Sequence, residues 1–205
     1  MKRLLTAFLL IPVVVCLILY APSNIFIAAL ILVGSFALRE VVQIGKYALV
    51  SWVGGVLYIG GAWGCAFSLR ALNPHWLLFA FLLSWAGDTA AYYIGKNFGR
   101  HKLAPVISPG KTWEGAIASV AGSMLVGAIY AHFLIPSAPL GLALIIAAVG
   151  NIAGQIGDLV ESAYKRWGGV KDSGSSLPGH GGWLDRIDSS LLSVPAVYVL
   201  VRFIA

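Results

Sequence analysis

The chain has 205 residues, of which 59% are hydrophobic and only 11% are charged. Soluble domains carry about 25% charged residues, so this composition excludes an ordinary soluble protein and indicates an integral membrane protein. The formal net charge of +6 would suggest nucleic-acid binding in a soluble chain. Here the positions of the basic residues are more informative than their sum, and we expect no nucleic-acid partner.

Long apolar stretches separated by short breakers predict an all-α, polytopic membrane helix bundle. A membrane-spanning helix needs about 20 apolar residues, and segments such as "APSN" and "IPSAP" contain ordinary helix breakers. No internal repeat is evident, so we expect one integral membrane domain over residues 1–205. The seven expected transmembrane helices cover residues 4–20, 25–44, 47–69, 76–95, 114–135, 139–164 and 187–204.

The first apolar segment also has two features of a signal peptide, a basic start and an apolar run. The run from Leu4 to Tyr20 is long for the apolar region of a signal peptide, and "YAPSN" is a weak cleavage site. We therefore expect a first transmembrane helix here.

The distribution of Lys and Arg predicts the orientation. If seven helices alternate in direction, twelve of the fourteen basic residues fall on one side, and only Arg70 and Arg202 fall on the other. Basic loop residues stay on the cytoplasmic side, which predicts a cytoplasmic N-terminus. The two most polar loops, 96–113 and 165–186, would then be cytoplasmic, and we expect the active site at that face.

Several carboxylates lie inside or beside the expected spans. Asp88 lies in "LLSWAGDTAAYYIG", and Asp158 and Glu161 lie in "GNIAGQIGDLVES". A carboxylate at membrane depth is costly, so it faces a polar cavity, an ion or a basic partner on another helix. For Asp88, a functional site (a polar cavity or an ion) and a structural ion pair with a basic residue both stay open. A structural ion pair is less favoured for Asp158, because Asp185 and Asp188 lie one loop away.

The spacing of these acids suits a hard cation. Asp185 and Asp188 are three residues apart at the expected start of the last helix, which places them on one face. Neighbouring carboxylates repel unless a proton or a cation relieves them. Oxygen ligands suit Mg²⁺, and no Cys/His cluster indicates zinc.

Basic residues and glycines surround the acids. The glycines of "PGHGG" let backbone N–H groups approach an anion, as does the start of a helix. A merely solvated loop would explain the basic residues but not the acids and glycines, so the segment predicts a polyphosphate site. His180 fits a phosphate donor and an ordinary loop residue equally well. The basic residues concerned are Lys165, Arg166, Lys171 and Arg186.

The segment "SPGKTWEG" contains Gly-Lys-Thr but is not a Walker A motif. That motif would require glycine at position 105, where the chain has Pro105. Lys111 still offers a positive charge to a phosphate, with a juxtamembrane anchor as the alternative.

The stretch "SAYKRWGGVKDSGSSLPGHGGWLDRID", Ser162 to Asp188, resembles the signature of phosphatidate cytidylyltransferases, also called CDP-diacylglycerol synthases. "WAGDTAAYYIGKNFGR", "SPGKTWEG" and "GQIGDLVES" are similar to other stretches of that family. The resemblance covers roughly residues 84–189, where we expect the catalytic motifs. Many bacterial members are longer, so we expect this chain to lack some of their N-terminal spans. The matching positions are Ser162, Lys165, Arg166, Lys171, Asp172, His180, Gly181, Gly182, Asp185, Arg186, Ile187 and Asp188.

The resemblance implies the reaction of CTP with phosphatidic acid to give CDP-diacylglycerol and pyrophosphate, in the plasma membrane of a bacterial cell. It also implies Mg²⁺, and dimers are known in the family. It links Asp158, Asp185 and Asp188 to metal binding, and our own hypothesis adds Asp88 as a polar-cavity residue and ligand of a second cation. The other expected site residues are Lys111, Lys165, Arg166, Lys171, Asp172, His180 and Arg186, with backbone contacts from Gly181 and Gly182.

Three other functions are alternatives to this one. A CDP-archaeol synthase would perform the same chemistry on an ether lipid. A CDP-alcohol phosphatidyltransferase needs a D-G-x-x-A-R run, which the chain does not contain. An ion-coupled transporter would have its site near the bilayer midplane and repeat symmetry, whereas the charges here gather at one face.

Overall fold

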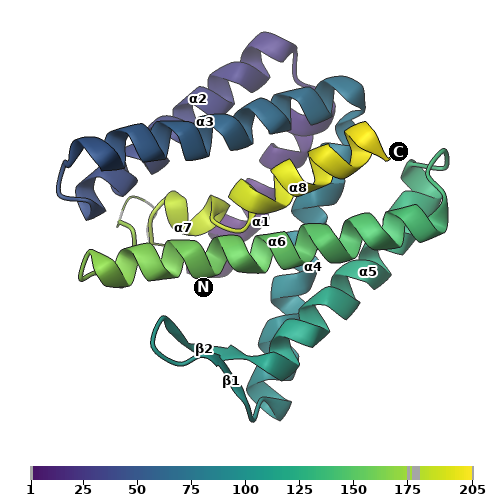
Figure 1. Cartoon of the computed structure of the whole chain (residues 1–205). Helices are drawn as coiled ribbons and strands as arrows, with labels where there is room; N and C mark the ends of the chain where they lie inside the picture. Colours follow the sequence, from purple (N-terminus) through teal and green to yellow (C-terminus); the bar gives the residue numbers. More distant parts are fainter. Residues whose placement is uncertain (1, 175, 177–180, 205) are drawn as a thin grey trace.

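The computed structural model of the protein describes residues 2–174, 176 and 181–204. These described residues form a helical bundle with one short hairpin (Figure 1), which confirms the predicted all-α class. The predicted helix at the C-terminus is divided in two near Asp188. The elements are α1 (Lys2–Leu19), α2 (Ser23–Ile44), α3 (Leu49–Leu72), α4 (Pro74–Phe98), β1 (Lys102–Ala104), β2 (Ser108–Thr112), α5 (Trp113–Leu134), α6 (Leu140–Trp167), α7 (Leu184–Ile187) and α8 (Ser190–Phe203).

Five helices of the described part, α2 to α6, are long and apolar enough to cross a membrane by length and composition. Their outer faces are apolar as well. On α5, Ile117, Leu125 and Phe133 repeat every eight residues along one face and are 67%, 64% and 72% exposed. Soluble monomers rarely expose contiguous apolar surface of this kind, so these faces suit contact with lipid. The cytoplasmic orientation of the N-terminus stays a prediction.

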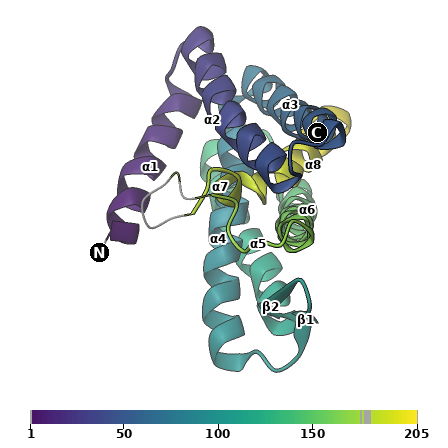
Figure 2. The same cartoon turned by 90° about the vertical axis from the view of Figure 1, so that its left-hand side faces the viewer.

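Helix α4 lies at the centre of the bundle (Figure 2), packed against α5, α6, α8, α3 and α1. Its N-terminal half fills the core, where Leu77, Phe79 and Leu83 are fully buried. Asn73 caps the helix by accepting a hydrogen bond from the backbone N–H of His75, and Pro74 occupies the first helical position, where its missing N–H does no harm. The C-terminal half of α4 is less covered, and it carries Asp88.

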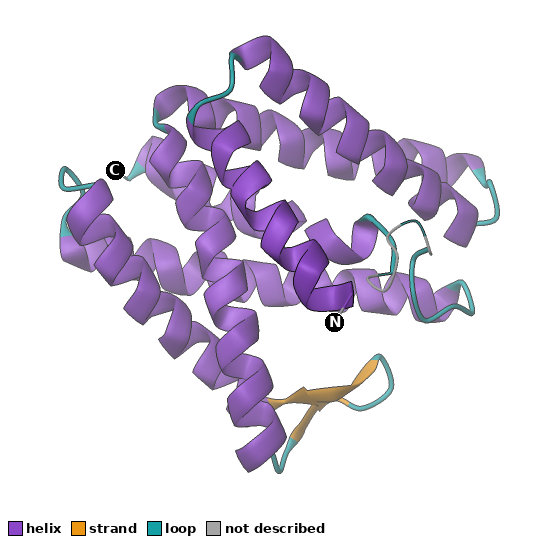
Figure 3. Cartoon of the chain, turned by 180° about the vertical axis from the view of Figure 1, so that it is seen from behind, coloured by secondary structure: helices purple, strands orange, loops and turns teal. Residues whose placement is uncertain are grey.

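The segment between α4 and α5, expected to be a loop, forms an antiparallel β-hairpin (Figure 3). Lys102 pairs with Thr112, and Ala104 pairs with Ser108. The hairpin continues directly into α5, because the Thr112 side chain accepts a hydrogen bond from Gly115 N at 3.2 Å and caps the helix. This fixes Lys111, the preceding residue, at the junction between hairpin and bundle.

Candidate active site

Three carboxylates meet where α6 approaches the α7–α8 junction. Ligand oxygens of Asp158, Glu161 and Asp188 all lie within 4.8 Å of one another, the one such group among the described residues. Asp158 and Glu161 are one turn apart on α6, so their side chains share a face. Gly157 makes the close approach possible: a Cβ at this position would lie 2.7 Å from the backbone oxygen of Asp188.

This carboxylate group is suited to a divalent cation. Glu161 is 4% exposed, and its Oε1 has no hydrogen-bonding partner in the part of the chain that the structure describes. Burial, followed by the charge of Asp158 and Glu161, raises the pKa of Asp188 well above its ordinary value. Clustered carboxylates of this kind are relieved by a proton or a cation, and oxygen-only ligands favour Mg²⁺ or Ca²⁺.

Asp185, expected to be a metal ligand, lies outside this carboxylate group. Its Oδ1 accepts a hydrogen bond from Lys165 Nζ at 2.6 Å, and its Oδ2 accepts from Gly182 N at 2.8 Å and Ser173 N at 3.1 Å. Burial alone would raise the pKa of Asp185, but Lys165 and these N–H groups hold it below the ordinary value. These contacts tie Asp185 to α6 and to the loop before α7, and its expected role as a metal ligand stays a prediction.

Lys165, expected to hold a phosphate, lies between two carboxylates. Its Nζ is 2.6 Å from both Glu161 Oε2 and Asp185 Oδ1, and the residue is 8% exposed. Gly182, whose N–H group was expected at a phosphate, donates it to Asp185 instead. Gly181 has a φ of +79°, the left-handed region that favours glycine. The phosphate roles expected for Lys165, Gly181 and Gly182 stay predictions.

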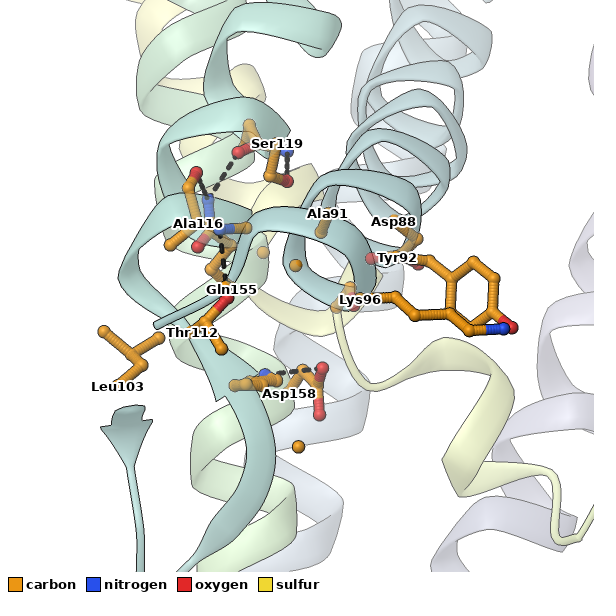
Figure 4. Close-up of a pocket in the computed structure, with 18 of the residues that line it drawn as sticks. Asp88, Ala91, Tyr92, Lys96, Leu103, Thr112, Ala116, Ser119, Gln155 and Asp158 are labelled. Carbon is orange, nitrogen blue, oxygen red and sulfur yellow. Dashed lines mark hydrogen bonds and ion pairs between the residues drawn. The ribbon is translucent and has the colours of Figure 1, made fainter. Parts of the chain in front are cut away.

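A cavity of about 570 Å³, the polar cavity, opens between α4, α5, α6 and the hairpin. Lys111 Nζ and Asp158 Oδ2 lie 2.6 Å apart and form one wall. Figure 4 shows Asp158 on one side of this polar cavity, with Asp88 and Lys96 on α4 at the other. Lys96 and Lys102 also line it. In the sequence, these two lysines indicate only the orientation of the helices in the membrane.

A second cavity of about 370 Å³, the apolar cavity, has a mostly apolar lining and a polar end. It shares Ser84, Asp88 and Ser189 with the polar cavity. The two cavities are therefore neighbours, with these three residues between them, close to the carboxylate group. The apolar lining includes Leu10, Ile11 and Val14 of α1, Phe26, Leu30 and Val33 of α2, and Phe81 and Trp85 of α4, and the polar end includes Asp88, Asp185, Arg186 and Asp188.

Of the other described residues expected at the site, Arg186 lines the apolar cavity, whereas Arg166, Lys171 and Asp172 line neither cavity. The exposed Arg166 donates to Ile107 O at 3.3 Å and to Val170 O at 3.1 Å, which ties the hairpin to the loop after α6. Lys171 and Asp172 are exposed on that loop. Arg186 is also exposed and borders the apolar cavity. His180 lies outside the described residues.

A further buried acid lies on α2, and no sequence motif predicts its role. Glu40, near the end of α2, is 3% exposed and accepts four hydrogen bonds from the segment that follows α6. A single acid at the end of an apolar helix carries no signal of such a distant contact, so the sequence could not identify it.

The protein is thus a membrane helix bundle with an acidic group beside a polar and an apolar cavity. Residues 66–204 match the model of the cytidylyltransferase family. The chain belongs to this family, which confirms the resemblance seen in its motifs.

Curated relatives agree with this assignment. The phosphatidate cytidylyltransferase of Staphylococcus saprophyticus is 44% identical to this chain over 146 residues, which are 71% of this chain and 56% of the relative. The phosphatidate cytidylyltransferases of Staphylococcus aureus strain COL and Staphylococcus epidermidis are 43% and 44% identical with the same coverage. The chain thus spans about half the length of the curated relatives it matches.

Proposed function

We propose that the protein transfers a cytidylyl group from CTP to phosphatidic acid, giving CDP-diacylglycerol and pyrophosphate for phospholipid biosynthesis. The observation that carries the proposal is the position of the carboxylate group beside two neighbouring cavities, one polar and one apolar, which share Asp88 and Ser189 in their walls. One substrate is soluble in water and the other is fixed in the bilayer. A reaction between them needs a site open to both environments.

The carboxylate group would hold Mg²⁺ through Asp158, Glu161 and Asp188. The unpartnered Oε1 of Glu161 and the short separation of the three carboxylates support this. When bound, the cation would supply positive charge to the phosphate oxygens and to the pyrophosphate leaving group. Asp88 borders both cavities and interacts electrostatically with Asp158, so it is our candidate ligand for a second cation.

The polar cavity would receive CTP. Lys96, Lys102 and Lys111 line it and offer positive charge to the triphosphate. Lys111 is held 2.6 Å from Asp158, so a phosphate that it binds lies next to the carboxylate group. The expected phosphate roles of Arg166 and Lys171, and the catalytic roles of Asp172 and His180, remain part of the proposal, supported by the signature that contains them.

The apolar cavity would receive an acyl chain of phosphatidic acid. Arg186 borders its polar end and is our candidate for the lipid phosphate. The names of the relatives favour the ester lipid over the ether lipid of a CDP-archaeol synthase. Turnover of the two lipids at equal surface concentration separates these functions.

The chemistry requires positioning more than proton transfer. An ionised phosphate oxygen of phosphatidic acid attacks the α-phosphorus of CTP, and the bond from that phosphorus to the oxygen bridging to the β-phosphate breaks. The electron pair leaves with pyrophosphate, so no strong general base is needed. Charge neutralisation and alignment dominate such transfers. In this protein the lysines of the polar cavity would align CTP, and Lys165 would keep Glu161 in place.

The proposal includes the membrane location, orientation and oligomeric state of the protein. The protein would lie in the plasma membrane with its N-terminus and active site on the cytoplasmic side, and it would form a homodimer. The catalytic motifs would lie within residues 84–189. The basic loops support the orientation.

Pyrophosphate release by the purified protein in detergent micelles tests the function. With CTP and Mg²⁺ present, we expect release only after phosphatidic acid is added, in equal amount to the CDP-diacylglycerol formed. Release without lipid, or no release with both substrates, would contradict the proposed function. Asp188→Asn is the matched inactive control.

A further inference from the structure

Glu40 connects α2 to the loop that leads into the active site. Its Oε2 accepts hydrogen bonds from Ser173 Oγ at 2.7 Å and from Leu184 N at 2.9 Å. Its Oε1 accepts from Trp183 N at 3.0 Å and from Ser176 Oγ at 3.3 Å. One buried carboxylate therefore holds both ends of the segment between α6 and α7.

The packing of α2 against residues 182 and 183 supports this contact. Phe36, one turn before Glu40 on α2, stacks on Trp183 with ring centroids 5.6 Å apart and planes 13° apart. A Cβ at position 182 would lie 2.3 Å from Glu40 Oε2, so a larger residue than Gly182 would displace the carboxylate. The same face of α2 thus provides an aromatic contact and a charged one.

Hydrogen bonds continue from Glu40 to the carboxylate group. Ser173 donates its hydroxyl to Glu40 and its backbone N–H to Asp185. Asp185 accepts from Lys165, whose Nζ also lies 2.6 Å from Glu161. A second connection runs along the backbone, since Glu40 accepts from the N–H groups of residues 183 and 184 at the start of α7, and Asp188 directly follows this helix.

We propose that Glu40 is a positioning residue that sets the geometry of the carboxylate group through Ser173 and α7. It lies outside the 66–204 segment that matches the family. The inference rests on the proposed function, because it concerns the same site. Residues that orient metal ligands typically change metal affinity or activity by about 10- to 100-fold when they are replaced.

The test compares Glu40→Gln with Gln43→Ala, a change at an exposed position on the same helix. Glutamine keeps the shape but replaces one acceptor oxygen by an NH₂ group that faces donors. We expect the Mg²⁺ concentration for half-maximal rate to rise roughly tenfold or more, with the KM for CTP changing much less. Gln43→Ala should match the wild type in both values.

Trypsin cleavage at Lys171 and Arg166, without substrates, supplies a second readout. We expect Glu40→Gln to be cleaved several times faster than Gln43→Ala. A folded Glu40→Gln protein with wild-type Mg²⁺ requirement and cleavage rate would overturn the proposal. If Glu40→Gln does not fold, Ser173→Ala decides, since it removes one of the four bonds: a raised Mg²⁺ requirement supports positioning and an unchanged one contradicts it.

The two proposals fail in different ways. An inactive wild-type protein would contradict the proposed function, and cleavage would still test Glu40. An active wild-type protein with unaltered variants would contradict the role of Glu40 alone.

Discussion

Replacing Gly157 by alanine tests the close approach of α6 to Asp188. The added Cβ would lie 2.7 Å from the backbone oxygen of Asp188, whereas ordinary contacts begin near 3.4 Å. The two segments must therefore separate by about 0.7 Å, and misplacing catalytic groups by about 1 Å can reduce the rate by about 10²-fold. We expect a loss of turnover of that order.

Gly154→Ala is the matched control one turn earlier on the same helix. Its Cβ would lie 3.4 Å from Ser189 O, an ordinary contact. Alanine is favoured over glycine inside a helix by about 0.5–1 kcal/mol, so this variant should be equally or more stable. In Gly157→Ala, overpacking of about 1–3 kcal/mol should offset that gain.

The assay measures CDP-diacylglycerol formation over a series of Mg²⁺ concentrations, together with thermal unfolding in detergent. Gly157→Ala should need more Mg²⁺ and turn over more slowly, while Gly154→Ala should resemble the wild type. Equal activity and Mg²⁺ requirement in the two variants would refute the reasoning, because only one of them moves Asp188.

Three further predictions address other parts of the site. Lys111→Gln should raise the KM for CTP roughly tenfold, as expected for loss of a charged hydrogen bond, whereas Lys46→Gln, in the α2–α3 turn, should not; equal effects would remove Lys111 from the nucleotide site. Val14→Trp should fill the apolar cavity and raise the KM for phosphatidic acid but not for CTP; an unchanged lipid KM would exclude this cavity. The lowered pKa of Asp185 means that its contribution to stability is present above about pH 4, the ordinary carboxyl value, and is lost as pH falls through the lowered pKa; the difference in Tm between wild type and Asp185→Asn should shrink below pH 4, and a constant difference would contradict this.

The helices could be predicted because membrane spans depend on apolar length alone. The hairpin could not, since β1 and β2 have three and five residues and no alternation of apolar and polar positions. The division of the last helix could not be predicted from sequence spacing either. The expected last helix is divided into α7 and α8, and Asp188 lies between them, close to Asp158 and Glu161 of α6.

The acids were found in the sequence, but their partners were not. Spacing places Asp185 and Asp188 on one face, and likewise Asp158 and Glu161, without showing which members of the two pairs meet. In the structure, Asp158 and Glu161 meet Asp188, whereas Asp185 lies outside this group and pairs with Lys165, which also contacts Glu161. Glu40 contacts residues more than 130 positions away, a relation that no local pattern contains.

The most direct test of the carboxylate group is a crystal structure with Mn²⁺ in place of Mg²⁺, located by its anomalous scattering. We predict a peak between Asp158, Glu161 and Asp188, within about 2.0–2.3 Å of their oxygens. No peak there at saturating Mn²⁺, or a peak at Asp185 with these three carboxylates free, would contradict the central claim.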